Sequence, residues 1–464
     1  MAGAEKVGAH IELGRRLGVP TPATRAMYAC ARFLDHARHA ARAPDGGGST
    51  VSINNRWFQL CASLIAMIMI ANLQYAWTLF VTPMQAATHW KLSDIQFAFT
   101  LFILFQTWIQ PLDGWLIDRL GPRGFISAAG VLCGLGWAGM GYATSLPMLY
   151  VMYCMAGAGA AFVYSGSIGS ALKWFKERRG LASGIMAAGF GGGTALFIPF
   201  ISRMLASSGH QATFVATGLF QGLVILIVAQ VLRHPPAEAA SAKPAGAPAA
   251  QLGKRQFTTL EMLRTPQFYA MYLAFVLMST GGLLVTANAG PIAKTWGHAA
   301  AVLTLAATLS PLANGASRIS WGWVSDYLGR ENTMIVAFLL QAFFLYMVVA
   351  VGQQSATWFV FALVMVYFTW GEIYSLFPAT SADYFGTRYA TSNYAVLYTA
   401  KGTASIMGGY IGALLYEKSG SWTMGFYGSA VMALVAAGIA FGLRNARLAE
   451  RARDASVSGA VLAK

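Results

Sequence analysis

The stretch GWLIDRLG at residues 114–121 returns in altered form as GWVSDYLG at residues 322–329. The two copies are 208 residues apart, and each follows a long apolar run. A second pair keeps a similar spacing, with WFKER at 174–178 and YFGTR at 384–388. The chain therefore contains two halves repeated in parallel. In membrane transporters built from such repeats, the substrate site lies near the bilayer midplane between the halves.

The composition places most of the chain in a lipid bilayer. Of its 464 residues, 56% are hydrophobic and 11% are charged, whereas a soluble domain carries about 25% charged residues. Apolar runs of about 20 residues recur, and each is long enough to cross a membrane as a helix. The net charge of +15 could favour nucleic acid, but the positive residues lie mostly in loops and tails. We expect a lipid bilayer as a partner and no nucleic acid.

We predict an all-α membrane protein with twelve transmembrane helices in two six-helix bundles. The bundles are expected at 57–233 and 265–444, joined by a cytoplasmic linker at 234–264 that is rich in Pro, Ala and Lys. Residues 1–56 lack a signal-peptide core, and we expect them to form a disordered cytoplasmic tail, as we expect 445–464 to form a second cytoplasmic tail. The predicted spans are roughly 58–81, 95–117, 123–143, 147–172, 180–203, 212–233, 267–289, 300–324, 333–352, 356–380, 390–415 and 423–444.

The distribution of positive charge predicts the orientation. If both termini are inside, most Lys and Arg residues of the loops fall on the cytoplasmic side. The outside loops and their edges then hold only Lys91, Arg203, Lys294 and Lys418. Because cytoplasmic loops carry an excess of Lys and Arg, we expect a multi-pass protein of the inner (plasma) membrane with both termini in the cytoplasm.

The repeated segments, extended to GWLIDRLGPR (114–123) and GWVSDYLGR (322–330), resemble the loop signature of the major facilitator superfamily. Their first glycine allows close helix packing, and the aspartate can meet a helix N-terminus or an arginine. We expect these positions to latch one conformation, more weakly in the second copy, where Tyr327 replaces Arg119. An ordinary charged turn would explain one copy, but two matched copies favour the signature. The predicted latch residues are Gly114, Asp118, Arg119, Arg123, Gly322 and Asp326.

Three ionisable residues lie deep within predicted spans: Arg318, Glu372 and Lys401. Lys401 is about eleven residues from one helix end and about fourteen from the other, or about 17 and 21 Å, which is too far for its side chain to reach water. A central charge costs at least about 2.5–3.5 kcal/mol on insertion scales, so Lys401 must face a cavity or a partner. Arg318 shares a helix face with Asn314, one turn earlier.

These charges allow two interpretations. In the first, which we favour, Arg318 and Lys401 form an anion site. In the second, Lys401 and Glu372 form a structural salt bridge. Glu372 is two residues from both Trp370 and Tyr374, so it points largely away from the face that those aromatic residues share. An aromatic box around two cations would select a small, flat anion.

Other polar and aromatic side chains are expected to complete the site. No histidine lies mid-membrane as a proton relay, so Glu372 is the deep carboxylate available for proton coupling. Asp113 adjoins the loop signature and is expected near the membrane interface. The motifs predict no catalytic residue, cofactor or metal site. The predicted substrate-binding residues are Arg318, Lys401, Trp370, Tyr374, Tyr75, Gln106, Tyr164 and Tyr398.

Six segments between about residues 57 and 444 together resemble the oxalate/formate antiporter family of the major facilitator superfamily. The resemblance implies exchange of external oxalate for internal formate. It also implies that Arg318 and Lys401 bind the carboxylates inside an aromatic cage that includes Trp370 and Tyr374. The segments are ANLQYAWTLFVTPMQ (71–85), FQTWIQPLDGWLIDRLGPR (105–123), ALKWFKERRGLASG (171–184), NGASRISWGWVSDYLGREN (314–332), WGEIYSLFPA (370–379) and YTAKG (398–402).

We therefore expect a monomeric transporter of small carboxylates, not an enzyme, because no bond is made or broken. The alternative is a proton-coupled symporter of small monocarboxylates. Related carriers of that kind have an aspartate near the arginine, where this chain has Asn314, which argues against symport, although Glu372 leaves it open. A third reading, a receptor or scaffold without transport, is disfavoured because it has no use for the insertion cost of buried cations.

Overall fold

The computed structural model describes residues 55–175, 179–233 and 256–462. In these ranges the chain forms helices joined by short turns and contains no strand. Most of the predicted N-terminal tail and linker lies outside the described residues, as do 176–178 in the second repeated pair.

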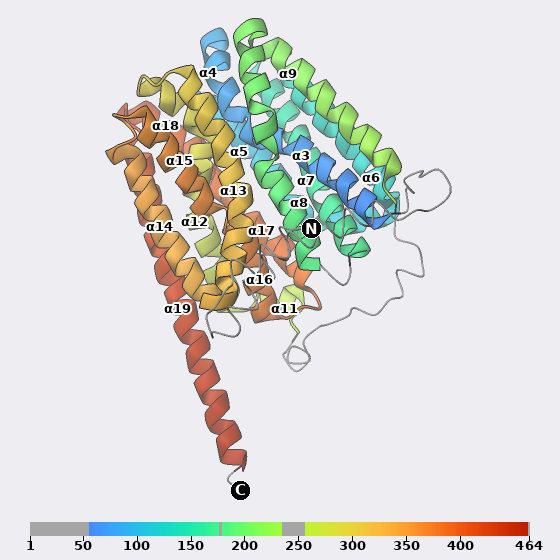
Figure 1. Ribbon diagram of the computed structural model, residues 1–464, viewed down its shortest axis with the longest axis vertical. Helices are drawn as coiled ribbons and strands as arrows, with labels where there is room; N and C mark the ends of the chain where they lie inside the picture. Colours follow the sequence, from blue (N-terminus) through green and yellow to red (C-terminus); the bar gives the residue numbers. More distant parts are fainter. Residues whose placement is uncertain (1–54, 176–178, 234–255, 463–464) are drawn as a thin grey trace, which may run out of the picture. The chain divides into compact units, whose positions relative to one another are not determined.

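The helices fall into two sets of six spans. The first set comprises α3 (Arg56–Tyr75), α4 (Trp77–Thr88), α5 (Leu92–Trp108), α6 (Gln110–Met140), α7 (Leu146–Trp174), α8 (Arg179–Gly192), η2 (Gly193–Leu196) and α9 (Ile198–Val231). The second comprises α11 (Thr259–Met262), α12 (Pro266–Thr295), α13 (Ala300–Leu328), α14 (Arg330–Ala350), α15 (Ala356–Trp370), α16 (Ile373–Phe385), α17 (Ala390–Ser405), η4 (Ile406–Ile411), α18 (Gly412–Ser419) and α19 (Thr423–Leu462). Figure 1 shows α3–α9 and α12–α19 as neighbouring groups.

Nine helices in the described ranges are long and apolar enough to span a membrane. One of them, Ala182–Val231, leaves helical geometry at Gly209 (φ 74°, ψ 175°) and so supplies two spans. Two more spans are interrupted helices. The second part of α6 follows a break at Gly121, and α17 joins α18 through a π-helical turn. The predicted twelve-span, two-bundle fold is confirmed.

The last glycine of each repeated segment has the same unusual backbone conformation. Gly121 has φ 68° and ψ 165°, and Gly329 has φ 82° and ψ 155°. Residues with a side chain are strained in this left-handed region, whereas glycine adopts it freely. Each copy therefore turns the chain between two spans at the corresponding place in its half.

Local chemistry also sets where helices begin. At the start of α12, the Thr265 hydroxyl accepts a hydrogen bond from the Phe268 amide at 3.3 Å, and Pro266 occupies the first helical position. The Asn55 side chain caps α3 in the same manner, accepting from the Trp57 amide at 2.9 Å. Polar caps thus mark where these two membrane spans start.

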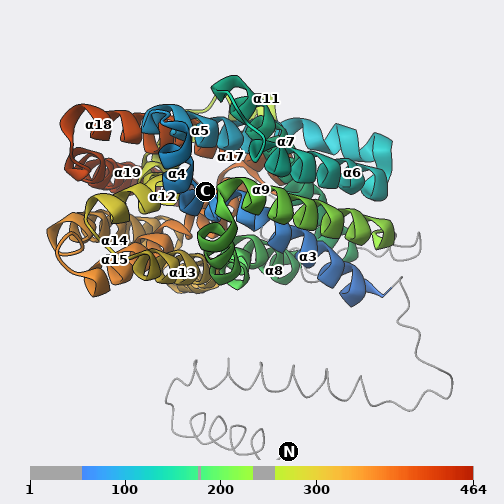
Figure 2. The same cartoon turned by 90° about the horizontal axis from the view of Figure 1, so that it is seen from above.

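The two halves meet along α5, which lies beside α17 in Figure 2. The Ser93 amide and hydroxyl donate to the Glu417 carboxylate at 2.8 and 2.7 Å. Gln96 Nε2 donates to a backbone carbonyl of α12 at 2.7 Å. The hydroxyls of Thr100 and Ser405 each donate to the other residue's carbonyl, at 2.9 and 3.2 Å. Because residues 93, 96 and 100 follow helical spacing, one face of α5 joins the halves at the end opposite the repeated loops.

Glycine permits a close contact between α4 and α12 at this end. The Gly290 amide donates to Thr78 Oγ1 at 2.6 Å. A Cβ atom on Gly290 would clash with the Thr78 carbonyl oxygen, which is fixed in the backbone of the other half. The closed contact between the halves therefore depends on the missing side chain.

We predict that Gly290→Ala lowers the thermal midpoint of unfolding in detergent micelles. Overpacking of a tight contact costs about 1–3 kcal/mol. The matched control is Gly428→Ala in α19, where a Cβ atom would meet nothing within 4 Å. Equal midpoints for the two variants would contradict the proposed importance of this contact.

Candidate anion-binding site

Two cations lie buried at the interface between the halves. Arg318 on α13 is 4% exposed, and Lys401 on α17 is 0% exposed. Within the described residues, no carboxylate lies within the 4.0 Å limit for an ion pair with either side chain. Both positive charges are therefore held by neutral groups.

Lys401 is held by the opposite half of the protein. Its Nζ donates to Gln74 Oε1 at 2.9 Å and to Gln106 Oε1 at 2.8 Å. A longer contact of 3.4 Å reaches the Tyr398 hydroxyl on its own helix. Since Gln74 and Gln106 belong to α3 and α5, this ammonium group links the two halves.

Arg318 has a single acceptor in hydrogen-bonding geometry. Its Nη2 donates to Asn314 Oδ1 at 3.0 Å, while Nε and Nη1 have no partner in the described part of the chain. The guanidinium carbon lies 4.2 Å from the Tyr374 ring centroid and 5.9 Å from that of Phe190. Most of the donor capacity of this side chain is therefore left for another group.

Aromatic rings surround both cations. Lys401 Nζ lies 5.5 Å from the Phe190 centroid, 5.7 Å from that of Tyr374 and 5.5 Å from that of Tyr398. The Tyr164 ring stacks on Tyr398 at 5.8 Å. Phe190 and Tyr374 thus contact both charges, which places Arg318 and Lys401 around one small volume.

Two further predicted aromatic residues complete the cage. The Tyr75 ring lies 5.7 Å from Phe190, and the Trp370 ring lies 5.7 Å from Tyr374. Span one breaks at Ala76, directly after Tyr75, and span ten breaks between Trp370 and Tyr374. The structure brings together all eight predicted substrate-binding residues, and each of them is buried.

The buried polar groups here are mostly donors without acceptors. Leaving a buried donor unpaired costs about 1–3 kcal/mol, so native structures seldom keep several together. Their chemistry suits a ligand that accepts hydrogen bonds at several points. Among the described residues of this site, the unpaired donors are Arg318 Nε and Nη1, Gln74 Nε2, Gln106 Nε2, Trp370 Nε1 and the hydroxyls of Tyr75, Tyr374 and Tyr394.

Sequence reasoning missed Gln74 and Phe190. Gln74 is an amide inside an apolar span and directly precedes Tyr75, and this position was a signal for a functional side chain. Phe190 stands within a run of glycines in α8. A run of glycines suggests helix packing or bending. It does not indicate that the Phe190 ring lies beside the two cations.

The two buried acidic residues have different surroundings. Glu372 is fully buried, and neither of its carboxyl oxygens has a hydrogen-bond partner among the described residues. The alternative salt bridge with Lys401 is not formed in this structure. Asp113 is buried within the protein and accepts a hydrogen bond from Ser165 Oγ on α7 at 2.5 Å, whereas its position near the membrane interface stays a prediction.

The predicted latch residues are spread over both repeated segments. The packing of Gly114 and the side chains of Asp118 and Arg119 on α6 lie outside the described part of the structure. Arg123 is exposed and donates to the Gln230 carbonyl at 2.5 Å.

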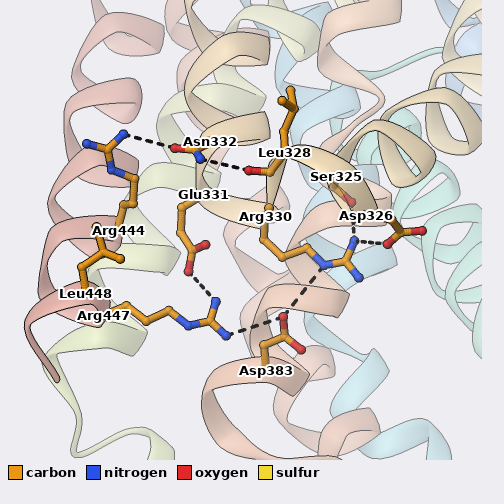
Figure 3. A pocket seen from close by; sticks show the side chains of 11 residues that line it. Ser325, Asp326, Leu328, Arg330, Glu331, Asn332, Asp383, Arg444, Arg447 and Leu448 are labelled. Carbon is orange, nitrogen blue, oxygen red and sulfur yellow. Dashed lines mark hydrogen bonds and ion pairs between the residues drawn. The ribbon is translucent and has the colours of Figure 1, made fainter. Parts of the chain in front are cut away.

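The second copy of the latch lies within one half of the protein. Asp326 pairs with Arg330 at 3.0 Å, and Arg330 is the first residue of α14 (Figure 3). Arg447 pairs with Glu331 at 2.6 Å. A Cβ atom on Gly322 would come no closer than 3.9 Å to a neighbour. Close packing therefore does not explain this glycine. The Asp326–Arg330 and Glu331–Arg447 ion pairs connect α13, α14 and α19 within the second half.

The comparisons with known proteins agree with the two-bundle membrane fold. The family model of the Major Facilitator Superfamily matches residues 62–291 and 269–463. The chain belongs to the major facilitator superfamily. It is thus a multi-pass membrane transporter and not an enzyme.

Individual relatives of this transporter include carriers of carboxylates. It is 39% identical over 397 residues to the oxalate:formate antiporter of Oxalobacter formigenes, covering 86% of this chain and 93% of that protein. It is 26% identical over 353 residues to an uncharacterised transporter of Escherichia coli (strain K12), covering 76% and 86%. It is 22% identical over 406 residues to monocarboxylate transporter 13 of Bos taurus, covering 86% and 90%. The resemblance drawn from the sequence segments is confirmed.

Proposed function

We propose that this transporter exchanges external oxalate for internal formate by alternating access, in the plasma membrane and with both termini in the cytoplasm. The observation that carries the proposal is the pair Arg318 and Lys401, which are buried together and, among the described residues, held by neutral groups alone. The 39% identity to a protein named as an oxalate:formate antiporter supports this pair of substrates.

Oxalate fits the chemistry of the site. It is small and flat, and it carries one carboxylate for each cation. A guanidinium suits the planar grip of a carboxylate, whereas an ammonium acts as a compact point charge. Arg318 and Lys401 would each form charge-assisted hydrogen bonds with one end of the dianion. The unpaired amide nitrogens of Gln74 and Gln106 could donate to the same oxygens.

The same two charges would make the transport an exchange. Positive charges in one dry interface repel each other, and removing them from water costs free energy that an opposite charge must offset. Oxalate would cancel both charges and let the halves close around it. Formate would cancel one charge, which permits the return step, whereas the empty carrier would cross poorly. Each cycle would move one net negative charge inward.

A second candidate is proton-coupled symport of small monocarboxylates. The observation that favours it is Glu372, a fully buried carboxyl group without a partner among the described residues. Such a group could bind and release a proton during the cycle. Symport of one proton with one monoanion would move no net charge, unlike the proposed exchange.

The deciding experiment is uptake of labelled oxalate into proteoliposomes preloaded with formate, with oxalate or with neither anion. Exchange predicts uptake only when an internal anion is present, together with an inside-negative potential when formate leaves. A potential-sensitive dye would record this potential. Uptake into empty vesicles that an inward proton gradient increases would instead support symport.

We predict that Arg318→Ala and Lys401→Ala each abolish oxalate exchange. Removing one partner of a buried charge interaction costs about 2–5 kcal/mol, which is about 30-fold or more in affinity. Lys294→Ala is the matched control, because Lys294 lies exposed at the end of α12. Gel filtration would show whether each variant folds. Normal exchange in either site variant would overturn the proposed role.

Glu372→Gln separates the two candidate functions. It keeps the size of the side chain but removes its ability to bind and release a proton. For the antiporter, we predict an exchange rate near that of the unaltered protein, measured by the same uptake assay. Complete loss of transport in a well-folded Glu372→Gln variant would support proton coupling.

A further inference from the structure

Asn314 holds Arg318 in place without neutralising it. Asn314 lies on α13, one turn before Arg318, and is fully buried. Its Oδ1 accepts from Arg318 Nη2 at 3.0 Å. A neutral amide orients the guanidinium as a carboxylate would, but it leaves the positive charge uncompensated.

The surroundings of Asn314 fix which way its amide points. Its Nδ2 donates to the Tyr367 carbonyl on α15 at 3.2 Å. A flipped amide would place its NH₂ group against the guanidinium, donor facing donor, and would leave the carbonyl opposite another carbonyl. The neighbours therefore turn the amide oxygen toward Arg318.

The space around this side chain is small. A Cβ atom on Gly191 would lie 3.0 Å from Asn314 Oδ1, and a Cβ atom on Gly371 would lie 2.9 Å from Asn314 Nδ2. Gly191 belongs to α8 of the first half, and Gly371 joins α15 to α16. Two glycines thus confine the amide. Aspartate has the same size and can keep an oxygen toward Arg318, but it loses the hydrogen bond that Asn314 Nδ2 donates to the Tyr367 carbonyl.

We infer that Asn314 determines the charge preference of the site, because its neutral amide positions Arg318 while leaving two positive charges to match a dianion. An aspartate at 3.0 Å from Arg318 would form an ion pair and cancel one of them. Lys401 would then be the remaining unmatched cation, and a monoanion would balance it. This inference rests on the proposed function, since it assigns the basis on which oxalate is preferred over formate.

The test compares Asn314→Asp and Asn314→Ala with the unaltered protein. Each full-length protein is reconstituted, and unlabelled oxalate and formate compete with labelled substrate for exchange. Asn314→Asp is expected to weaken apparent oxalate affinity by about tenfold or more, with a smaller change for formate. Asn314→Ala removes the positioning contact without adding charge, so both affinities should fall in similar proportion.

The outcomes separate charge from structure. A merely structural role would weaken both anions alike in the two variants, so an unchanged oxalate-to-formate ratio in Asn314→Asp would overturn the inference. Unchanged oxalate and formate affinities in Asn314→Ala would also overturn the inference. If Asn314→Asp does not fold, the affinities of Asn314→Ala provide the test. If the unaltered protein transports neither anion, the proposed function fails and the inference falls with it. Exchange in the unaltered protein with an unchanged ratio in Asn314→Asp refutes the inference alone.

Discussion

The uncompensated charge of Arg318 and Lys401 is the constraint around which the interface between the halves is built. Neither cation can reach water from its buried position, and each is held by amide oxygens instead of carboxylates. Gln74 and Gln106 reach Lys401 from the opposite half, so its position depends on the halves being together. The charge of Lys401, which is costly to bury, thus lies where an anion could bind it and where its contacts change when the halves move apart.

Closure of the interface uses a different kind of contact. Along α5 the halves are joined by short polar side chains that bond to backbone atoms, and glycines such as Gly290 permit close approach. The groups in these contacts are neutral apart from Glu417, which accepts hydrogen bonds from Ser93 near the start of α5. They can form and separate at modest cost, which suits an interface that must open. We interpret the charge of the two cations as what determines whether the halves close. We interpret the contacts of Ser93, Gln96 and Thr100 on α5 as what holds the closed halves together.

The sequence predicted the repeat, the spans and the central cations because each leaves a local signal. Two glycine-ended loops mark the repeat, and a lysine deep in an apolar run is visible without any structure. The contacts between helices left no such signal. Gln74, Phe190 and the partners along α5 depend on which helix faces become neighbours, and periodicity within one span does not specify that. The hydrogen bond between Asp113 and Ser165 of α7 depends on neighbouring helix faces in the same way.

The proposed mechanism requires that a dianion allows the two halves to close. Electron paramagnetic resonance can test this requirement with two pairs of spin labels at exposed positions. Ser208 and Ser421 lie at the end of the protein where α5 begins, and Gly124 and Thr387 lie at the end with the repeated loops. With oxalate, we predict one short distance for each pair. Without an anion, we predict a longer distance between the labels of one of the two pairs. Distance distributions that do not respond to oxalate would contradict the account.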